Sequence, residues 1–389
     1  MKFEIIESLD GLLEKADKWN ELWERSGSES PQARAETIAT WVRHFSQPSR
    51  FRAVVVTSGD GWHVGLPILL DRRGPIRLAT LLRNDVTDGG SLVWDRESLS
   101  GDVADALVDG LKATGAKLLW FDKIPAEEAT WRKLRESLEQ RGLESELRLQ
   151  HGVGIVLTTD SWEWYESHLS KNHRKNIRKA LGRLEKIGRV EFRDSLELDS
   201  SACARWWDTF VDIEDDNWKG HAGSSLKRSE RVGAYYQQLY ADMLQSGHLE
   251  LLQLTLDGEP IAAEFGYHGK QTYFSNKVGY RDQYSDFSPG HLLMYLQIKH
   301  YHEQGHRRKL HAISPITHAM TRWANALEHQ YRLTASLSRV PGNQLAKAIN
   351  VAVKSIRRIK GRTEWVAPEL PASGSLERLA RSEATRFAP

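Results

Sequence analysis

Apolar and polar positions follow strand-like patterns from residue 249, and a helical pattern replaces them near residue 290. Three runs of strand character precede one helix and a further strand: LELLQLTL (249–256), PIAAEFGYH (260–268), QTYFSNKVGYR (271–281), HLLMYLQIKHYHEQG (291–305) and KLHAI (309–313). Asp257-Gly258-Glu259 and Gly269-Lys270 are turns of the kind that close hairpins, and Gly305 ends the helix. The pattern predicts a β-rich block with one helix before its last strand.

The helix of this block begins at a strand-to-helix junction, YSDFSPG (284–290). Ser, Pro and Gly packed together at such a start leave backbone N–H groups unpaired, and these groups can bind an anion. A proline in the first turn can equally do no more than start the helix. The junction alone leaves both interpretations open.

The first half of the chain has the same order of predicted elements. After a mainly helical region (1–47), a hairpin (52–70), further strands and an acidic helix (101–114) lead to the strand KLLWFDKI (117–124). Residue identity between the halves is low, so the repeat is one of element order. It predicts two copies of one α/β unit that join near residues 147–158.

A densely basic helix is predicted over SKNHRKNIRKALGRLEKIGR (170–189). Apolar residues form one stripe, and eight Lys and Arg side chains stand against a single acid, Glu185. This face can be a solvated surface, a surface for nucleic acid or another anionic polymer, or a wall of a cleft for an anionic substrate.

Two groups of potential metal ligands are better explained without a metal. Glu214, Asp215 and Asp216 have no His at ligand spacing, so a loop cap is the expected role. Four histidines invite a zinc interpretation, but three of them lie on or just beyond one helix and no Cys supports them: His300, His302, His306 and His311. We expect no metal.

Composition is that of an ordinary globular protein. The 389 residues are enough for two or three domains, and 54 basic against 52 acidic residues do not suggest a wholesale nucleic-acid binder. The one cysteine, Cys203, excludes an internal disulfide framework and fits a reducing compartment. The start MKFEIIESLD has no signal-peptide pattern and no run of 18 apolar residues follows, so we expect a cytoplasmic protein.

Three motifs occur in order along the second half: the basic helix LSKNHRKNIRKALGRLEKIG, an E-x3-WKG segment from Glu214 to Gly220, and GEPIAA followed by SPGHLL. In these motifs the chain resembles the GNAT superfamily of acyl-CoA-dependent N-acyltransferases, most closely its CelD-like branch, which is linked to cellulose and other exopolysaccharide synthesis. The resemblance implies an α/β fold of tandem GNAT-like domains, each a mixed, mostly antiparallel twisted sheet flanked by helices. The expected parts are a domain at 1–150, an acyltransferase domain at 151–338, and a basic amphipathic helix with a flexible tail at 339–389.

The resemblance also implies an acyl-CoA site in the second half, with acetyl-CoA or another acyl-CoA as co-substrate. Acyl transfer to an amine needs a strand for the thioester, a helix start for the pyrophosphate, a base and an acid. We expect Glu264 as the base, with His311 as second choice, and Tyr280 as the acid, although Glu264 can also be an ordinary solvent-facing strand residue. The expected CoA contacts are Lys277, Val278, Ser288, Gly290, His291 and Leu292, and the expected acceptor contacts are Arg174, Arg178, Glu214, Trp218 and Lys219.

The first half is expected to lack an acyl-CoA site. Its corresponding segment, DRESLSGDVADAL (95–107), places Asp102 and Asp105 in or beside the first helical turn. Carboxylates there satisfy the helix N-terminus themselves and repel a pyrophosphate.

Two other functions stay open. The Fem-type aminoacyltransferases share this tandem fold and use aminoacyl-tRNA, and in such an enzyme the basic helix would contact RNA. Alternatively, the chain is a non-catalytic scaffold of the polysaccharide machinery, with its basic tail helix (343–362) touching the membrane. The sequence predicts an amine of a sugar or another small molecule as acceptor without naming it.

Overall fold

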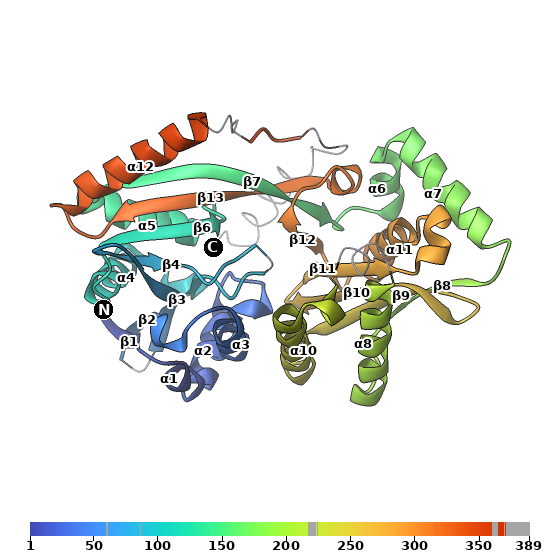
Figure 1. Ribbon diagram of the computed structural model, residues 1–389, viewed down its shortest axis with the longest axis horizontal. Coiled ribbons are helices and arrows are strands. Elements are labelled where there is room, and N and C mark those ends of the chain that lie inside the picture. Colours follow the sequence, from blue (N-terminus) through green and yellow to red (C-terminus); the bar gives the residue numbers. More distant parts are fainter. Residues whose placement is uncertain are drawn as a thin grey trace. The chain divides into compact units, whose positions relative to one another are not determined.

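A computed structural model describes residues 1–59, 61–85, 87–216, 223, 225–359, 365–368 and 370 (Figure 1). The chain divides into two compact units, here called unit 1 (Met1–His151 with His329–Val366) and unit 2 (Gly152–Glu328 with Ala367–Pro389). The division lies beside the boundary expected at residue 150. The last strand and the helix after it group with unit 1, whereas the sequence assigned the strand to the second domain.

Unit 1 contains one sheet with the strand order β1-β2-β3-β4-β6-β13-β7, and β5 pairs with β3. All the pairs described for these strands are antiparallel except β4 with β6. The strands are β1 (Lys2–Ile6), β2 (Phe51–Ser58), β3 (Gly61–Arg73), β4 (Ile76–Thr80), β5 (Val93–Trp94), β6 (Leu118–Ile124), the first part of β7 (Ser145–Leu157) and most of β13 (Ala326–Ser336).

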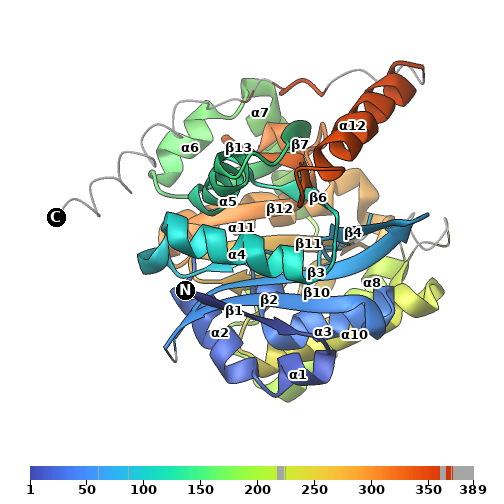
Figure 2. The same cartoon turned by 90° about the vertical axis from the view of Figure 1, so that its left-hand side faces the viewer.

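Helices cover both faces of the unit 1 sheet. Residues from β2, β3 and β6, such as Val54, Leu66 and Leu119, form one core with α4 and α5, which lie side by side (Figures 1 and 2). On the other face, Trp19 packs against Gly65, and Ala346 of α12 packs against Leu78 and Leu118. The helices are α1 (Leu9–Leu13), α2 (Ala16–Arg25), α3 (Ala35–Phe45), α4 (Gly101–Ala113), α5 (Ala129–Gln140) and α12 (Gly342–Ile359), with the short η1 (Pro31–Ala33), η2 (Pro48–Arg50) and η3 (Arg96–Ser98).

The strands of unit 2 continue the strand order as β7-β12-β11-β10-β9-β8, and their pairs are antiparallel except for β11 with β12. Its strands are the rest of β7, β8 (Val190–Asp194), β9 (Leu249–Leu256), β10 (Glu259–Gly269), β11 (Thr272–Tyr280) and β12 (Lys309–Pro315). Its helices are α6 (Trp162–His168), α7 (Lys171–Leu184), α8 (Ser200–Asp215), α10 (Glu230–Gln245) and α11 (Pro289–Gln304), with η4 (Leu226–Arg228), η5 (Asp282–Phe287) and η6 (Met320–Arg322). The predicted strands and helix of the 249–313 block are confirmed within a few residues.

The two faces of the unit 2 sheet have different cores (Figure 1). Tyr273, Leu310 and neighbouring apolar residues pack against α11 on one face. On the other face, Phe265 meets Trp207 and Phe210 of α8 and Tyr236 of α10. The prediction of tandem α/β units, each with a mostly antiparallel sheet flanked by helices, is therefore confirmed.

Two buried carboxylates lie within the α11-side core of unit 2. Tyr273 donates a hydrogen bond of 3.1 Å from its hydroxyl to Glu264 Oε1. Nearby, Glu250 accepts from the Tyr301 hydroxyl at 2.6 Å and from Arg307 Nε at 2.9 Å. Burial raises the pKa of Glu250 despite the opposing pull of Arg307. A buried carboxylate without hydrogen-bond donors is costly, so Tyr273, Tyr301 and Arg307 stabilise the fold by donating to these two carboxylates.

We expect Gly266→Ala to destabilise the protein and Gly182→Ala to stabilise it slightly. A Cβ at Gly266 would lie 2.0 Å from the Tyr273 hydroxyl oxygen, so Tyr273 must move away from Glu264. A buried carboxylate that loses its donor costs about 2 kcal/mol. A Cβ at Gly182, in α7, meets nothing within 4 Å, and alanine there favours the helix by about 0.5–1 kcal/mol. Urea unfolding measures both changes, and equal midpoints for the two variants would contradict the assignment.

Candidate active site

The divergence of β11 from β12 is the central feature of unit 2. The two strands run parallel and pair over only three residues each, Thr272↔Lys309, Tyr273↔Leu310 and Phe274↔His311. Beyond these pairs, β11 follows β10 as far as Tyr280, while β12 follows β7 as far as Pro315. In the described strands, the facing backbone edges past Phe274 and His311 are therefore not paired with each other. We call this divergence the fork, and Phe274 and His311 its tip.

The backbone departs from regular strand geometry on both sides of the fork. The register of β11 against β10 shifts between Phe265 and Gly266, which leaves Asn276 as the extra residue of a β-bulge. On β12, Ile313 has φ of +57°, a conformation that costs a β-branched residue about 1–2 kcal/mol. Bulges and strained residues gather at functional sites because the surrounding structure must hold them in place.

The start of α11 lies over the far end of β11. Ser288 precedes the helix with φ 52° and ψ 52°, and its side chain makes no capping hydrogen bond. A Cβ on Gly290 would lie 3.8 Å from Tyr280 Cδ1 and 4.0 Å from Val278 Cγ2. The helix start and the last residues of β11 therefore form one surface, as the sequence predicts for a pyrophosphate site.

The N–H groups of this helix start are not equally available. The Ser288 carbonyl accepts from His291 N at 2.9 Å and from Leu292 N at 3.2 Å, and Ser288 N donates to Ser285 O at 2.9 Å. Four of the predicted CoA contacts lie at this helix start: Ser288, Gly290, His291 and Leu292. Among them, the N–H of Gly290 is the one without an acceptor in the described part of the chain. An anion that binds here would meet Gly290 N–H first.

The other predicted CoA contacts surround this surface unevenly. Val278 is 40% exposed beside Gly290, whereas the Leu292 side chain is fully buried. Lys277 points to the opposite face of β11, where its ammonium lies 4.9 Å from the Tyr236 ring centroid. His291 lies beside Trp323, with ring centroids 6.0 Å apart, and burial together with Arg322 lowers the pKa of His291.

The predicted catalytic residues lie in three different surroundings. Glu264 is 1% exposed within the α11-side core, so an amine from solvent does not reach it in this conformation. His311 lies on the opposite face of the sheet, where its ring contacts Phe274 at the fork tip. Tyr280 is half-buried at the helix-start end of β11, six residues beyond Phe274 and therefore about 20 Å along the strand.

The His311 ring contacts the Glu328 carboxylate, a residue that the sequence analysis did not identify. The backbone N–H of Ile313 donates to His311 Nδ1 at 3.0 Å, so the neutral ring carries its proton on Nε2. Nε2 faces Glu328 Oε1 at 3.3 Å. Glu328 comes from the start of β13, and no local motif marks it. The strained backbone at Ile313 thus fixes the imidazole that positions Glu328 at the fork tip.

Asn276 is a second residue that the sequence analysis missed. Its side chain accepts from the Tyr236 hydroxyl at 2.9 Å, and its amide nitrogen lies 3.5 Å from the Tyr267 hydroxyl. Asparagine is depleted in strands, so its position within the run QTYFSNKVGYR is the signal that could have indicated a bulge. Asn276 connects the bulge to α10 on the face where His311 lies.

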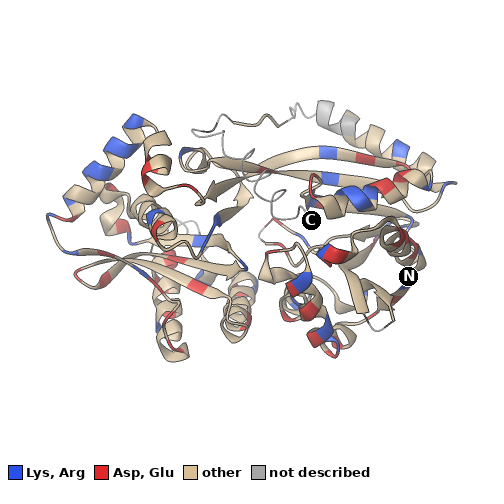
Figure 3. Ribbon diagram, turned by 180° about the vertical axis from the view of Figure 1, so that it is seen from behind, with Lys and Arg blue, Asp and Glu red and all other residues tan. Residues whose placement is uncertain are grey.

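The basic helix α7 lies beside the start of α11. Arg183 places its guanidinium 4.9 Å from the Phe287 ring centroid, and its Nη1 lies 3.4 Å from Asp286 O in η5. Arg178 pairs with Glu166 at 3.0 Å, and Arg174 is half-buried. Lys and Arg residues follow one another along α7 (Figure 3). The positive charge is therefore close to the proposed pyrophosphate end of the fork.

The predicted acceptor contacts near the α8 end are partly described. Glu214 is fully buried and accepts from Leu226 N at 2.9 Å, which ties the end of α8 to η4. A Cβ at Gly279 would lie 2.9 Å from Glu214 Cα, so this part of α8 lies against β11. Trp218 and Lys219 lie outside the described residues. No group of three or more potential metal ligands is found in the described part of the chain.

Comparison with known proteins defines the class of this region. Residues 171–311, from the first residue of α7 to the fork tip, match the family model of an acetyltransferase (GNAT) domain. This segment therefore resembles a GNAT-type acetyltransferase domain, and residues 1–151 of unit 1 lie outside the match. No curated protein sequence matches the chain.

Two solved structures share the fold over nearly the whole chain. FemX superposes with a TM-score of 0.57 at 11% identity, covering 89% of this chain and 99% of FemX. The C-terminal domain of a proposed lysylphosphatidylglycerol synthetase from Agrobacterium fabrum superposes with a TM-score of 0.51 at 15% identity, covering 88% of this chain and 96% of that domain. At these identities the likeness concerns the fold alone. Every helix in the described residues is too short or too polar to cross a bilayer.

The stability of the protein should fall as the pH drops from about 6.5 to 4, in part through His173. Burial, with smaller contributions from His291 and Arg322, lowers the pKa of His173 to about 4, against 6.5 for a free histidine. In this window the unfolded chain binds a proton that the folded chain does not, so acid favours unfolding. His173→Phe keeps the contact with Trp323 and should flatten the decline in urea unfolding between these pH values, whereas exposed His318→Phe should not. An unchanged pH slope in His173→Phe would contradict the neutral buried state.

Proposed function

We propose that unit 2 transfers an acyl group, most simply acetyl, from acyl-CoA to a primary amine of a sugar or another small molecule. One observation carries the proposal: a fork of two parallel strands has an uncapped helix start over one end and a carboxylate–imidazole pair at the other. The match to an acetyltransferase domain supports the same reaction class. The CelD-like motifs of the sequence support a role in exopolysaccharide synthesis, in the cytoplasm, where acyl-CoA is made.

The two ends of the fork suit the two ends of an acyl-CoA. Pyrophosphate suits the α11 start, because Gly290 N–H is available there and the basic helix α7 lies alongside. The thioester then suits the fork tip, about 20 Å away along β11. Between them, the backbone of β11 that does not pair with β12 can hold an extended chain by hydrogen bonds.

Proton transfer from the amine is assigned to Glu328, positioned by His311. Attack on a thioester requires a neutral amine, so an ammonium acceptor must first lose a proton. His311 is not free to take it, because Nδ1 accepts from Ile313 and Nε2 faces Glu328. Glu328 keeps 28% of its side chain exposed, whereas Glu264 is buried in the other core. The carboxylate is therefore the better base, and His311 orients it.

A second donor, aminoacyl-tRNA, is favoured by one specific observation. Four lysines project from the basic segment at exposed positions and form no ion pair in the described residues: Lys171, Lys175, Lys179 and Lys186. The helix α7 has 14 residues and is therefore about 21 Å long, which exceeds what one pyrophosphate can occupy. A polyanion such as RNA would use the full row.

Gly290→Glu should weaken CoA binding, whereas Gly290→Ala should preserve it. Both side chains fit, because the nearest atoms to a Cβ lie 3.8 and 4.0 Å away, and an acid in the first turn favours the helix. Only glutamate places negative charge where phosphate binds. Calorimetry with CoA should give one site per wild-type chain and at least about tenfold weaker binding for Gly290→Glu.

Three results would contradict this donor assignment. Equal CoA affinity in the two Gly290 variants would place the site elsewhere. Two CoA per chain would show that unit 1 also binds. No CoA binding by the wild type, with retention of RNA that falls steeply with salt, would establish the tRNA alternative instead.

Glu328→Gln should lower kcat/KM for the amine by about 10²-fold or more and leave CoA affinity unchanged. The amide keeps the size of the side chain and its contact with His311 but cannot accept the proton. The pH–rate profile should lose its acidic limb in the variant. Glu303→Gln, on the exposed side of α11, is the matched control. Wild-type rates in Glu328→Gln would overturn the assignment of Glu328 as the base and would favour Glu264 instead.

A further inference from the structure

Unit 1 contains a fork of its own. The parallel strands β4 and β6 pair over three residues each, Leu78↔Leu118, Ala79↔Leu119 and Thr80↔Trp120, and β4 then ends. Shortly after the last pair, Lys123 has φ of +56°, as Ile313 has +57° after the tip in unit 2. Trp120 therefore holds in unit 1 the place that His311 holds in unit 2. Trp120 lies on the sheet face opposite α4, the helix that connects β4 to β6. His311 likewise lies on the face opposite α11, the helix that connects β11 to β12.

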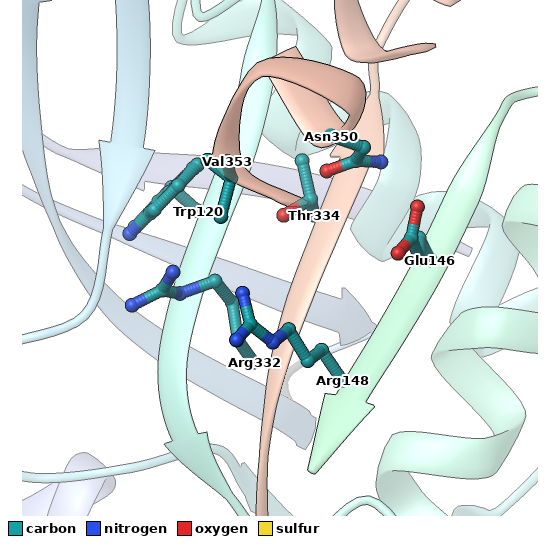
Figure 4. A pocket seen from close by; sticks show the side chains of 7 residues that line it. All are labelled: Trp120, Glu146, Arg148, Arg332, Thr334, Asn350 and Val353. Atoms are coloured by element: carbon teal, nitrogen blue, oxygen red, sulfur yellow. The ribbon is translucent and has the colours of Figure 1, made fainter. Parts of the chain in front are cut away.

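A cavity opens beside Trp120 within unit 1 (Figure 4). Its walls come from β6, β7, β13 and α12, and all belong to unit 1. The free space is about 10 Å³, room for one oxygen-sized group. The lining residues are Trp120, Glu146, Arg148, Arg332, Thr334, Asn350 and Val353.

Two guanidinium groups point to the same side of this cavity, towards Trp120 (Figure 4). Arg332 is fixed there, because its Nε donates to Asp122 Oδ1 at 2.5 Å and its guanidinium lies 4.3 Å from the Trp120 ring centroid. The Asp122 carboxylate therefore neutralises Arg332.

Arg148 has no such partner. Its Nη1 is buried and has no hydrogen-bond acceptor in the described part of the chain, and no ion pair there involves Arg148. Glu146 lies away from both guanidinium groups in Figure 4. Since arginine stays charged at any ordinary pH, the cavity holds a cationic donor that needs an acceptor. Native structures rarely leave such a group unsatisfied without a bound water or ion.

We propose that this cavity takes one oxygen of a carboxylate or a phosphate, between Arg148 and Arg332. Two neighbouring guanidinium groups suit carboxylate or phosphate oxygens, since they offer several N–H donors in a fixed plane. The Thr334 hydroxyl and the Asn350 amide line the same space and add donors. A water molecule would satisfy Nη1 but would leave the charge without a counter-ion. The site is independent of acyl transfer in unit 2.

The experiment compares anions on the intact chain at constant ionic strength set with sodium chloride. Inorganic phosphate and acetate are titrated into the wild type, Arg148→Met and Arg73→Met, with the melting temperature and calorimetric heat as readouts. Arg73 is exposed on β3 of unit 1 and controls for general charge effects. We expect at least one anion to raise the melting temperature of the wild type and of Arg73→Met, and to bind Arg148→Met at least about tenfold more weakly.

A second variant covers the case in which Arg148→Met fails to fold. Asn350→Asp, on the outer helix α12, places a carboxylate in the cavity, so it should raise the melting temperature without added anion and remove the response to phosphate and acetate. A response confined to phosphate or to acetate identifies which oxyanion the cavity takes. If neither anion changes the wild type, or if Arg148→Met and Asn350→Asp respond as the wild type does, the cavity holds only water and the proposal is overturned.

Discussion

The short parallel pairing of β11 with β12 is the constraint on which the site depends. Three pairs join the strands, and each strand then follows a different antiparallel neighbour, β10 on one side and β7 on the other. Antiparallel pairs hold their register strongly, so β11 and β12 cannot close up without breaking those longer ladders. The open backbone between them is thus imposed by the rest of the sheet. It stays available without help from side chains inside the fork.

The buried polar groups of unit 2 support this geometry from one face. Glu250 and Glu264 hold Tyr301 and Tyr273, and both tyrosines lie in the core between the sheet and α11. Because Tyr273 is also one of the three paired residues, the core that fixes α11 fixes the fork tip as well. The helix start and the tip are consequently held at opposite ends of one packed layer. A donor that spans the fork finds both ends already in position, which lowers the ordering cost of binding.

Local patterns predicted the elements of unit 2 well, because alternation and turn residues depend on neighbours in sequence. The run 249–256 has the bounds of β9, and the predicted helix start lies within α11. The faces of β11 could not be predicted in the same way. The bulge at Asn276 breaks the period of two, so Tyr273 shares a face with Val278 and Lys277 turns to the other side. Likewise, Glu328 reaches His311 from β13, the next strand along the chain, and follows no recognisable motif.

The two units show how far a shared backbone determines chemistry. Each has a three-residue parallel pair, a crossing helix and a left-handed residue shortly after the tip. At the tip, unit 2 has an imidazole that orients a carboxylate, whereas unit 1 has an indole that stacks under a guanidinium. The start of α4 carries Asp102 in its first turn, whereas the first turn of α11 has no acid. An acid there satisfies the helix N-terminus and repels phosphate, which is why the proposed acyl-CoA site is assigned to unit 2 and not to unit 1. Function in this chain therefore follows the side chains placed on the two forks, while the forks themselves follow from strand pairing.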